Sequence, residues 1–230
     1  MPNAEVLAER RFTPGAVEIR SAEDGGKRIT GYGSVFNKVS RNLGGFVEIV
    51  TPAAFNKSRG DGFPAAVCRY NHDPNMLLGT IGGGTLTLGV DNLGLRYDVL
   101  PPQSRADIVE LVERGDVKHS SFAFRVPKGG DDWGLTDQSY PMRALLSVEL
   151  VDVAPVVDPA YPDATAALRS LAAFKQCPVE DVMALSRQGE LRRFFVRTDG
   201  PVQPPGGKRR LSGAQAALAL AERRFDPYDE

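Results

Sequence analysis

The chain has 230 residues, with 28 basic and 29 acidic side chains and a formal net charge of −1. This length suffices for one domain of ordinary size with an appendage. The near-zero charge creates no field that attracts nucleic acid or an anionic membrane, so we expect neither as a partner. No apolar run approaches the roughly 18 residues of a membrane span, and we expect a soluble protein without a visible export signal.

The sequence contains no pattern that is typical of a metal site or a cofactor site. Its two cysteines, Cys68 and Cys177, have neither zinc-type spacing nor the arrangement of a disulfide framework. There is no glycine-rich phosphate loop with its lysine and no cluster of Cys and His residues. We therefore expect free thiols in a reducing compartment, with no cofactor and no bound metal.

Short apolar runs, mostly alternating, predict strands at intervals through the first 157 residues. In chain order, the predicted strands cover residues 16–20, 28–36, 46–50, 65–70, 77–81, 85–90, 94–100, 117–125 and 142–157. The first two should form an antiparallel hairpin, and the three between residues 77 and 100 indicate a meander or barrel wall. Pro155 and Pro159 limit the last strand to a sheet edge or a turn in its later portion.

Helices are predicted at five places, three of them in the C-terminal part of the chain. The predicted helices cover residues 51–58 with Thr51 as N-cap, 104–114 with Ser104 as cap, 164–176, 179–196 with an interruption at Gly189, and 212–224. A linker rich in proline, glycine and basic residues, 199–210, precedes the last helix. We expect a main domain over residues 1–170 and a helical tail over 171–230 that tethers the protein or is removed by processing.

The run Val117–Arg125 places two adjacent hydroxyl groups, Ser120 and Ser121, inside a strand-like segment. A strand that starts at the rim of a sheet can present a nucleophile. The alternative is that both serines only begin the strand and bond to neighbouring backbone groups.

A serine nucleophile that uses an imidazole base has two possible partners here, because His72 and His119 are the only histidines. His119 and Ser121 share a strand face but lie about 6 to 7 Å apart along the chain, too far for a direct hydrogen bond. His72 follows a different predicted strand, residues 65–70, and lies where that strand passes into a loop at Pro74. It is therefore the better candidate for the base. The alternative is that its imidazole caps the Asn-His-Asp turn.

Seven sequence blocks occur in a characteristic order. They are Gly31–Phe36, Glu48 with Pro52–Phe55, Asn71–Asp73 followed by Leu78-Gly79, Asp91–Leu95, Arg114–Val117, Ser121–Phe124 and Asp152–Pro162. Together they resemble the prohead (capsid maturation) protease family of tailed bacteriophages, which is distantly similar to the herpesvirus assembly protease. The resemblance covers about residues 28 to 170.

The resemblance implies a serine endopeptidase on a closed or nearly closed antiparallel β-barrel flanked by helices. Together with the predicted strands and helices, it gives a mainly β, α+β fold with a helical C-terminal tail. It implies His72 as base and Ser121 as nucleophile. The expected substrates are segments of the major capsid protein or a scaffold protein, cleaved in the host cytoplasm inside the assembling prohead. Cleavage of the chain by itself and a homo-oligomeric state are left open.

The resemblance implies Asp152 as the third member of the site, with Glu149 as its competitor. Strand neighbours alternate faces, so these two residues, three apart, should point to opposite sides and only one can orient His72. Ser120 stays an alternative nucleophile. Two other functions remain open: a non-catalytic capsid-assembly scaffolding protein of the same fold, and a serine esterase of another fold, which the absence of a Gly-X-Ser-X-Gly elbow disfavours.

Overall fold

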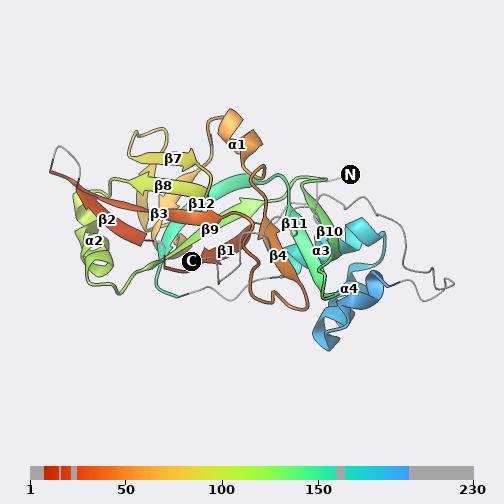
Figure 1. Ribbon diagram of the computed structural model, residues 1–230. Helices are drawn as coiled ribbons and strands as arrows, with labels where there is room; N and C mark the ends of the chain where they lie inside the picture. The colour runs from red at the N-terminus through yellow and green to blue at the C-terminus, as the bar shows by residue number, and fades with distance from the viewer. Residues whose placement is uncertain (1–7, 16, 22–24, 159–163, 197–230) are drawn as a thin grey trace, which may run out of the picture. The chain divides into compact units, whose positions relative to one another are not determined.

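The computed structural model describes residues 8–15, 17–21, 25–158 and 164–196, and Figure 1 shows their arrangement. This part of the chain is a strand-rich α+β structure, as the alternating runs predict. The strands are β1 (Glu9–Thr13), β2 (Val17–Ser21), β3 (Lys27–Val35), β4 (Val47–Val50), β5 (Val67–Arg69), β6 (Leu77–Thr80), β7 (Leu86–Val90), β8 (Gly94–Val99), β9 (His119–Arg125), β10 (Asp131–Leu135), β11 (Pro141–Leu145) and β12 (Glu149–Val156). The helices are α1 (Asn56–Gly60), α2 (Ala106–Glu113), α3 (Thr165–Lys175) and α4 (Val179–Gln188), with short 3-10 turns η1 (Tyr70–His72), η2 (Gln103–Arg105) and η3 (Leu191–Phe194).

The described residues divide into two compact units. The first contains the described residues of ranges 8–36, 52–130 and 147–158, with a five-stranded and a four-stranded sheet. The second contains residues 37–51, 131–146 and 164–196, with a three-stranded sheet. The predicted boundary between residues 170 and 171 stays a prediction, and α3 runs across this position.

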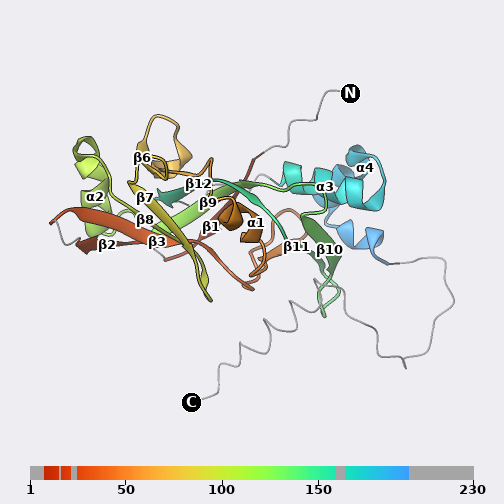
Figure 2. The same ribbon diagram turned by 90° about the horizontal axis from the view of Figure 1, so that it is seen from above.

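The five-stranded sheet carries the residues of interest, and its strand order is β1-β9-β12-β5-β6. In Figure 2, β1, β9 and β12 are seen side by side. Strand β9 pairs antiparallel with β1 and with β12, and β12 runs parallel to β5. The rings of Phe122 and Phe124 stack with 4.8 Å between their centroids, and both are buried in the core. Because side chains alternate along a strand, Ser121 and Ala123 lie on the opposite face of β9.

The four-stranded sheet is antiparallel throughout, with the order β2-β3-β8-β7. Its β2–β3 pair confirms the predicted hairpin. Strand β3 passes close to the five-stranded sheet at Gly33, where an added Cβ would lie 3.2 Å from Val153 Cγ1 and 3.5 Å from Phe122 Cβ. Glycine permits this close approach, because a Cβ here would force the Val153 side chain to shift by a few tenths of an ångström.

The strand pairing corrects one topological prediction and leaves another unconfirmed. The meander expected between residues 77 and 100 is wrong for its first strand, since β6 pairs with β5 while β7 pairs with β8. Strands β5 and β6 are joined by a short connection that contains the turn η1, and a short connection of this kind favours an antiparallel pair. The described strands form three open sheets, and the closed or nearly closed barrel stays a prediction.

The second unit contains the sheet β10-β11-β4 and the helices α3 and α4. The two helices lie against one another in both views (Figures 1 and 2). Its buried Arg143 contacts Glu48 at 3.1 Å and Asp131 at 2.6 Å. The expected single strand over residues 142–157 is therefore wrong: β11 belongs to this sheet, whereas β12 belongs to the five-stranded sheet. Residues Asp131–Leu135, which lie between the predicted strands 117–125 and 142–157, form β10, for which no strand was predicted.

Helices α2, α3 and α4 agree with the predicted positions except near their ends, whereas α1 overlaps only the last part of the predicted helix over 51–58. Thr51 is not the cap of α1, because its hydroxyl donates to the Leu145 carbonyl and the helix begins at Asn56. Ser104 lies in the turn η2, and α2 begins at Ala106 without a side-chain cap. Helix α4 ends at Gln188, and the next residue, Gly189, has a φ of 71°, which suits glycine just after a helix C-terminus. The predicted helix over 212–224 lies outside the described residues.

Candidate active site

Strand β9 presents its two serines to different surroundings. Ser120 is fully buried, and its Oγ lies 2.9 Å from the Tyr97 hydroxyl oxygen. Burial raises the pKa of Tyr97, so this phenol stays protonated and can donate to Ser120. Ser121 lies on the other face of β9, opposite Phe12 of β1 and Ala154 of β12. The structure thus separates the predicted nucleophile from its alternative.

His72 reaches this face from the end of β5 through the turn η1. Asn71 and His72 have φ angles of 52° and 58°, a left-handed backbone that is uncommon for residues other than glycine. The Asn71 side-chain oxygen accepts a hydrogen bond from the Val157 backbone N–H at 3.1 Å, which ties the turn to the end of β12. The His72 side chain is buried over the sheet, and backbone strain of this kind often accompanies functional residues.

Asp152 lies on β12, between β9 and β5. Its Oδ1 is 2.5 Å from His72 Nδ1, and its Oδ2 accepts from Arg69 Nη1 at 3.2 Å. The carboxylate is almost completely buried, and the Arg69 cation balances its charge.

The alternative acid, Glu149, is exposed at the start of β12. The expectation that Glu149 and Asp152 point to opposite sides is wrong, because a register shift between Leu150 and Asp152 inserts an extra residue. Glu149 faces Arg125 and Asp152 faces Ala123, and these partners lie two residues apart on β9, on one face. The difference between the two acids is therefore position along the strand, with Asp152 beside His72.

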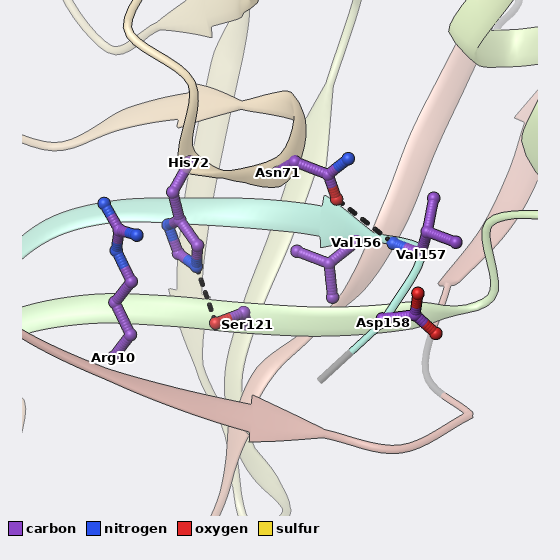
Figure 3. Close-up of a pocket in the computed structure, with 7 residues that line it drawn as sticks. All are labelled: Arg10, Asn71, His72, Ser121, Val156, Val157 and Asp158. Atoms are coloured by element: carbon purple, nitrogen blue, oxygen red, sulfur yellow. Dashed lines mark hydrogen bonds between the residues drawn. The ribbon is translucent and has the colours of Figure 1, made fainter. Parts of the chain in front are cut away.

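Ser121, His72 and Asp152 form one continuous chain of hydrogen bonds. His72 Nε2 lies 2.6 Å from Ser121 Oγ, as Figure 3 shows, while Nδ1 faces the Asp152 carboxylate. Because a carboxylate only accepts, Nδ1 carries the ring proton and the lone pair of Nε2 faces the hydroxyl. Such an arrangement can remove the proton of Ser121 and make its oxygen a nucleophile. The catalytic roles of these residues stay predictions.

A cavity of about 250 Å³ opens beside this chain of hydrogen bonds. Figure 3 shows the residues that line it, which are Arg10, Asn71, His72, Ser121, Val156, Val157 and Asp158. The cavity gives a substrate group room next to Ser121 Oγ, although the serine itself is buried in the sheet. Small pockets with convergent polar groups of this kind are typical of ligand and substrate sites.

The second histidine has a different role from His72. His119 Nδ1 accepts the backbone N–H of Gly15 at 3.0 Å, and its ring meets Phe12 edge-on at 4.9 Å between centroids. Desolvation, with a smaller contribution from the Lys118 charge, lowers the pKa of His119. The structure therefore joins His119 to the turn after β1 rather than to Ser121.

Two contacts at the site were not foreseen from the sequence. Arg69 holds the second oxygen of Asp152, and the Arg11 carbonyl lies 2.9 Å from Ser121 Oγ as a further acceptor for the hydroxyl. Arg69 stands three residues before His72, but nothing in that spacing indicates a partner on β12. The Arg11 contact depends on the pairing of β1 with β9, which no local pattern encodes.

Within the described ranges, no group of three or more His, Cys, Asp or Glu side chains is arranged to hold a metal ion. Cys68 is buried and Cys177 is half-buried, and both thiols are free, as predicted. None of the helices in the described part of the chain is long and apolar enough to cross a membrane.

Comparison with known proteins identifies one family. The family model described as caudovirus prohead serine protease matches residues 15–177. No curated protein and no solved structure matches the chain. The matched range includes Ser121, His72 and Asp152, and it leaves out β1. The distant similarity to the herpesvirus assembly protease stays a prediction.

Proposed function

Because this chain belongs to the family of caudovirus prohead serine proteases, we propose that it is an endopeptidase that uses Ser121 as nucleophile. In this proposal, His72 is the general base and Asp152 is the third member of the triad. The substrates are segments of the capsid or scaffold protein, cleaved during prohead maturation in the host cell. The observation that supports these roles best is the buried chain of two short contacts, 2.5 Å and 2.6 Å, that joins the three side chains.

The proposed reaction follows from the order of these contacts. His72 Nε2 takes the hydroxyl proton while Ser121 Oγ attacks the scissile carbonyl carbon, and the Asp152 carboxylate stabilises the resulting imidazolium. The imidazolium then gives its proton to the leaving amine as the C–N bond breaks, leaving an acyl-enzyme. A water molecule, deprotonated by His72, attacks this ester, and Ser121 regains its proton as the product acid leaves.

Arg69 has a supporting part in this proposal. Its guanidinium holds Asp152 Oδ2, so the carboxylate keeps Oδ1 directed at His72 Nδ1. A charge-assisted hydrogen bond of this kind fixes orientation as well as charge. We propose Arg69 as a positioning residue, since its side chain acts through Asp152.

The proposed function also assigns a role to each of the two parts of the chain that the sequence predicts. Residues 1–170 would carry the protease, and residues 171–230 would tether it to the shell or scaffold until the tail is removed. Self-cleavage predicts a wild-type product that ends between about Gln176 and Gly213 and is missing in Ser121→Ala. Mass spectrometry of purified protein held at neutral pH measures this directly, and an intact chain in mature shells would contradict it.

Co-expression with the capsid and scaffold proteins of the same phage tests the proposed substrates. Wild type and Ser120→Ala should yield shortened capsid or scaffold protein, whereas Ser121→Ala and His72→Ala should leave both at full length. N-terminal sequencing of the products then locates the cleaved bond. Shells that assemble with full-length proteins alongside the wild-type chain would instead support the non-catalytic scaffolding role.

A further inference from the structure

One charged side chain beside Ser121 has no role in the proposed reaction. Arg10 lies on β1 opposite Ala123 of β9, and Phe12 lies opposite Ser121. Arg10 is therefore on the same sheet face as the nucleophile, and its side chain lines the cavity next to His72 and Ser121 (Figure 3). The side chain is exposed, although the strand that carries it is held by a continuous ladder to β9.

Arg10 differs from the other arginines around the site because, among the described residues, it has no acidic partner. Arg69 is paired with Asp152, and Arg11 is paired with Glu9 at 2.6 Å. Among the described residues, the Arg10 guanidinium makes no hydrogen bond or ion pair, so its five N–H groups face the cavity and solvent. A cation of this kind, carried by a strand that pairs with β9, is available to a substrate.

The opposite end of the cavity carries the opposite charge. Figure 3 shows Arg10 and Asp158 at the two ends of the pocket, with His72 and Ser121 between them and with Val156 and Val157 as an apolar wall near Asp158. A peptide that crosses the pocket therefore meets a cation on one side of Ser121 and a carboxylate on the other. A substrate side chain with the same charge as the pocket residue that it faces is disfavoured. The opposite charges of Arg10 and Asp158 therefore discriminate between peptides by the charge on each side of the scissile bond.

We propose that Arg10 is a specificity-determining residue that selects peptides with an acidic side chain close to the scissile bond, on the side of the bond that faces β1. Asp158 disfavours an acidic side chain on the other side of that bond. This inference rests on the proposed endopeptidase function, and it names the chemical class of substrate that the site prefers. A guanidinium recognises a carboxylate through two parallel hydrogen bonds, which gives geometric as well as electrostatic selection.

Cleavage-site mapping on a peptide mixture tests the proposal. Peptides from a chymotrypsin-digested proteome are incubated with wild type, Arg10→Glu, Arg10→Lys and Ser121→Ala, and the new termini are identified by mass spectrometry. Wild type should cut next to Asp or Glu on one side of the bond, and Arg10→Lys should keep this preference. Arg10→Glu should instead cut next to Lys or Arg on that side of the bond. Arg59→Glu, which reverses an exposed arginine on α1, is the matched control and should leave the profile unchanged.

A pair of matched peptides then separates recognition from chemistry. The two peptides share one mapped site and differ only by Glu or Lys at the selected position. Reversing the charge of Arg10 should change the ratio of their kcat/KM values by about tenfold, mostly through KM. An equal loss of kcat for both peptides would overturn the proposal, because Arg10 would then act on the reacting atoms. Identical cleavage profiles for wild type and Arg10→Glu would overturn it as well.

A binding experiment keeps this inference distinct from the proposed function. Immobilised Ser121→Ala protein should retain acidic peptides from the same mixture, and the double variant Ser121→Ala/Arg10→Glu should not. If these peptides are retained but wild type cleaves nothing in a Ser121-dependent way, the endopeptidase proposal fails while recognition by Arg10 stands. If cleavage depends on Ser121 but neither cleavage nor retention depends on the charge at position 10, only the inference about Arg10 fails.

Discussion

Ser120 and Ser121 are neighbours in the chain, but β9 directs their hydroxyl groups to opposite faces of a sheet. Ser120 contacts the buried Tyr97 hydroxyl, whereas Ser121 contacts His72. Alternation along a strand thus gives adjacent and chemically identical side chains different surroundings. The two alanine variants should differ accordingly.

If the proposed triad is right, Ser121→Ala should lower the rate of peptide cleavage by about 10⁴-fold or more, because loss of one triad member removes most of the catalysis. Its free energy of unfolding should stay within about 1 kcal/mol of wild type, since one hydrogen-bonding hydroxyl is lost.

Ser120→Ala should remain active but lose about 1 to 3 kcal/mol of stability, because the Tyr97 hydroxyl is left buried without its partner. Cleavage assays and urea unfolding measure both quantities. The reverse pattern would assign the nucleophile to Ser120.

Arg69→Met should lower kcat by about ten- to a hundredfold with little change in KM, because the buried Asp152 loses the contact that directs it at His72. Arg69→Lys should recover much of the rate, since an ammonium can also donate to Oδ2. Steady-state kinetics on one peptide checks this. Equal kcat values for wild type and Arg69→Met would show that His72 is oriented without Arg69.

His119 predicts a pH dependence of stability rather than of catalysis. Its Nδ1 accepts a backbone N–H from Gly15, and desolvation lowers its pKa from the ordinary value of 6.5. The unfolded chain therefore binds the proton more readily, so this contribution to stability is complete above about pH 6.5 and is lost as the pH falls below that value. Unfolding experiments between pH 5 and 8 should show that the difference between wild type and His119→Ala shrinks towards low pH. A constant difference would contradict the Gly15 contact.

At the scale of the element, the turn η1 determines where His72 is held. Asn71 contributes in two ways, through its left-handed backbone and through the hydrogen bond from the Val157 N–H. Asparagine adopts this backbone conformation more easily than most residues. Both contributions can be separated by two substitutions at one position.

Asn71→Ala should destabilise the protein by about 2 to 3 kcal/mol, because alanine is strained in the left-handed region and cannot accept from Val157. Asn71→Gly should cost less, about 1 kcal/mol, since glycine adopts this conformation freely and only the hydrogen bond is lost. Urea unfolding gives the two free energies, and the cleavage rate should fall more in Asn71→Ala. Equal losses in both variants would mean that backbone strain at Asn71 has no effect on the site.

The elements also show which predictions a sequence can support. The alternation in β9 and the proline after the Asn-His-Asp turn are local signals, and they were enough to predict a strand at Ser121 and a loop edge at His72. The extra residue before Asp152 leaves no local signal, so the expected faces of Glu149 and Asp152 were wrong although Asp152 is the acid beside His72. Thr51 has the sequence of a helix cap, but its hydroxyl donates to Leu145, 94 residues away.

At the scale of the whole molecule, the strand-rich α+β class and most segment positions follow from periodicity, because each depends on neighbouring residues. The sheet to which each strand belongs does not follow from periodicity. Packing between segments that are distant in the sequence determines the partners of β6, β11 and β12. For the same reason the division into two units, each assembled from separate segments, was not predicted. The family was predictable, because ordered sequence blocks carry information that no single element does, and the family match confirms it.

The central claim is that His72 and Asp152 activate Ser121 in the folded protein, and covalent labelling tests it without knowledge of the substrate. A fluorophosphonate probe reacts with a serine hydroxyl that a neighbouring base activates. Intact-mass and peptide-mapping measurements should find one adduct, on Ser121, in wild type and in Ser120→Ala. The adduct should be absent from Ser121→Ala and from His72→Ala. A folded wild-type protein without a label on Ser121, or a label on Ser121 that persists in His72→Ala, would contradict the claim.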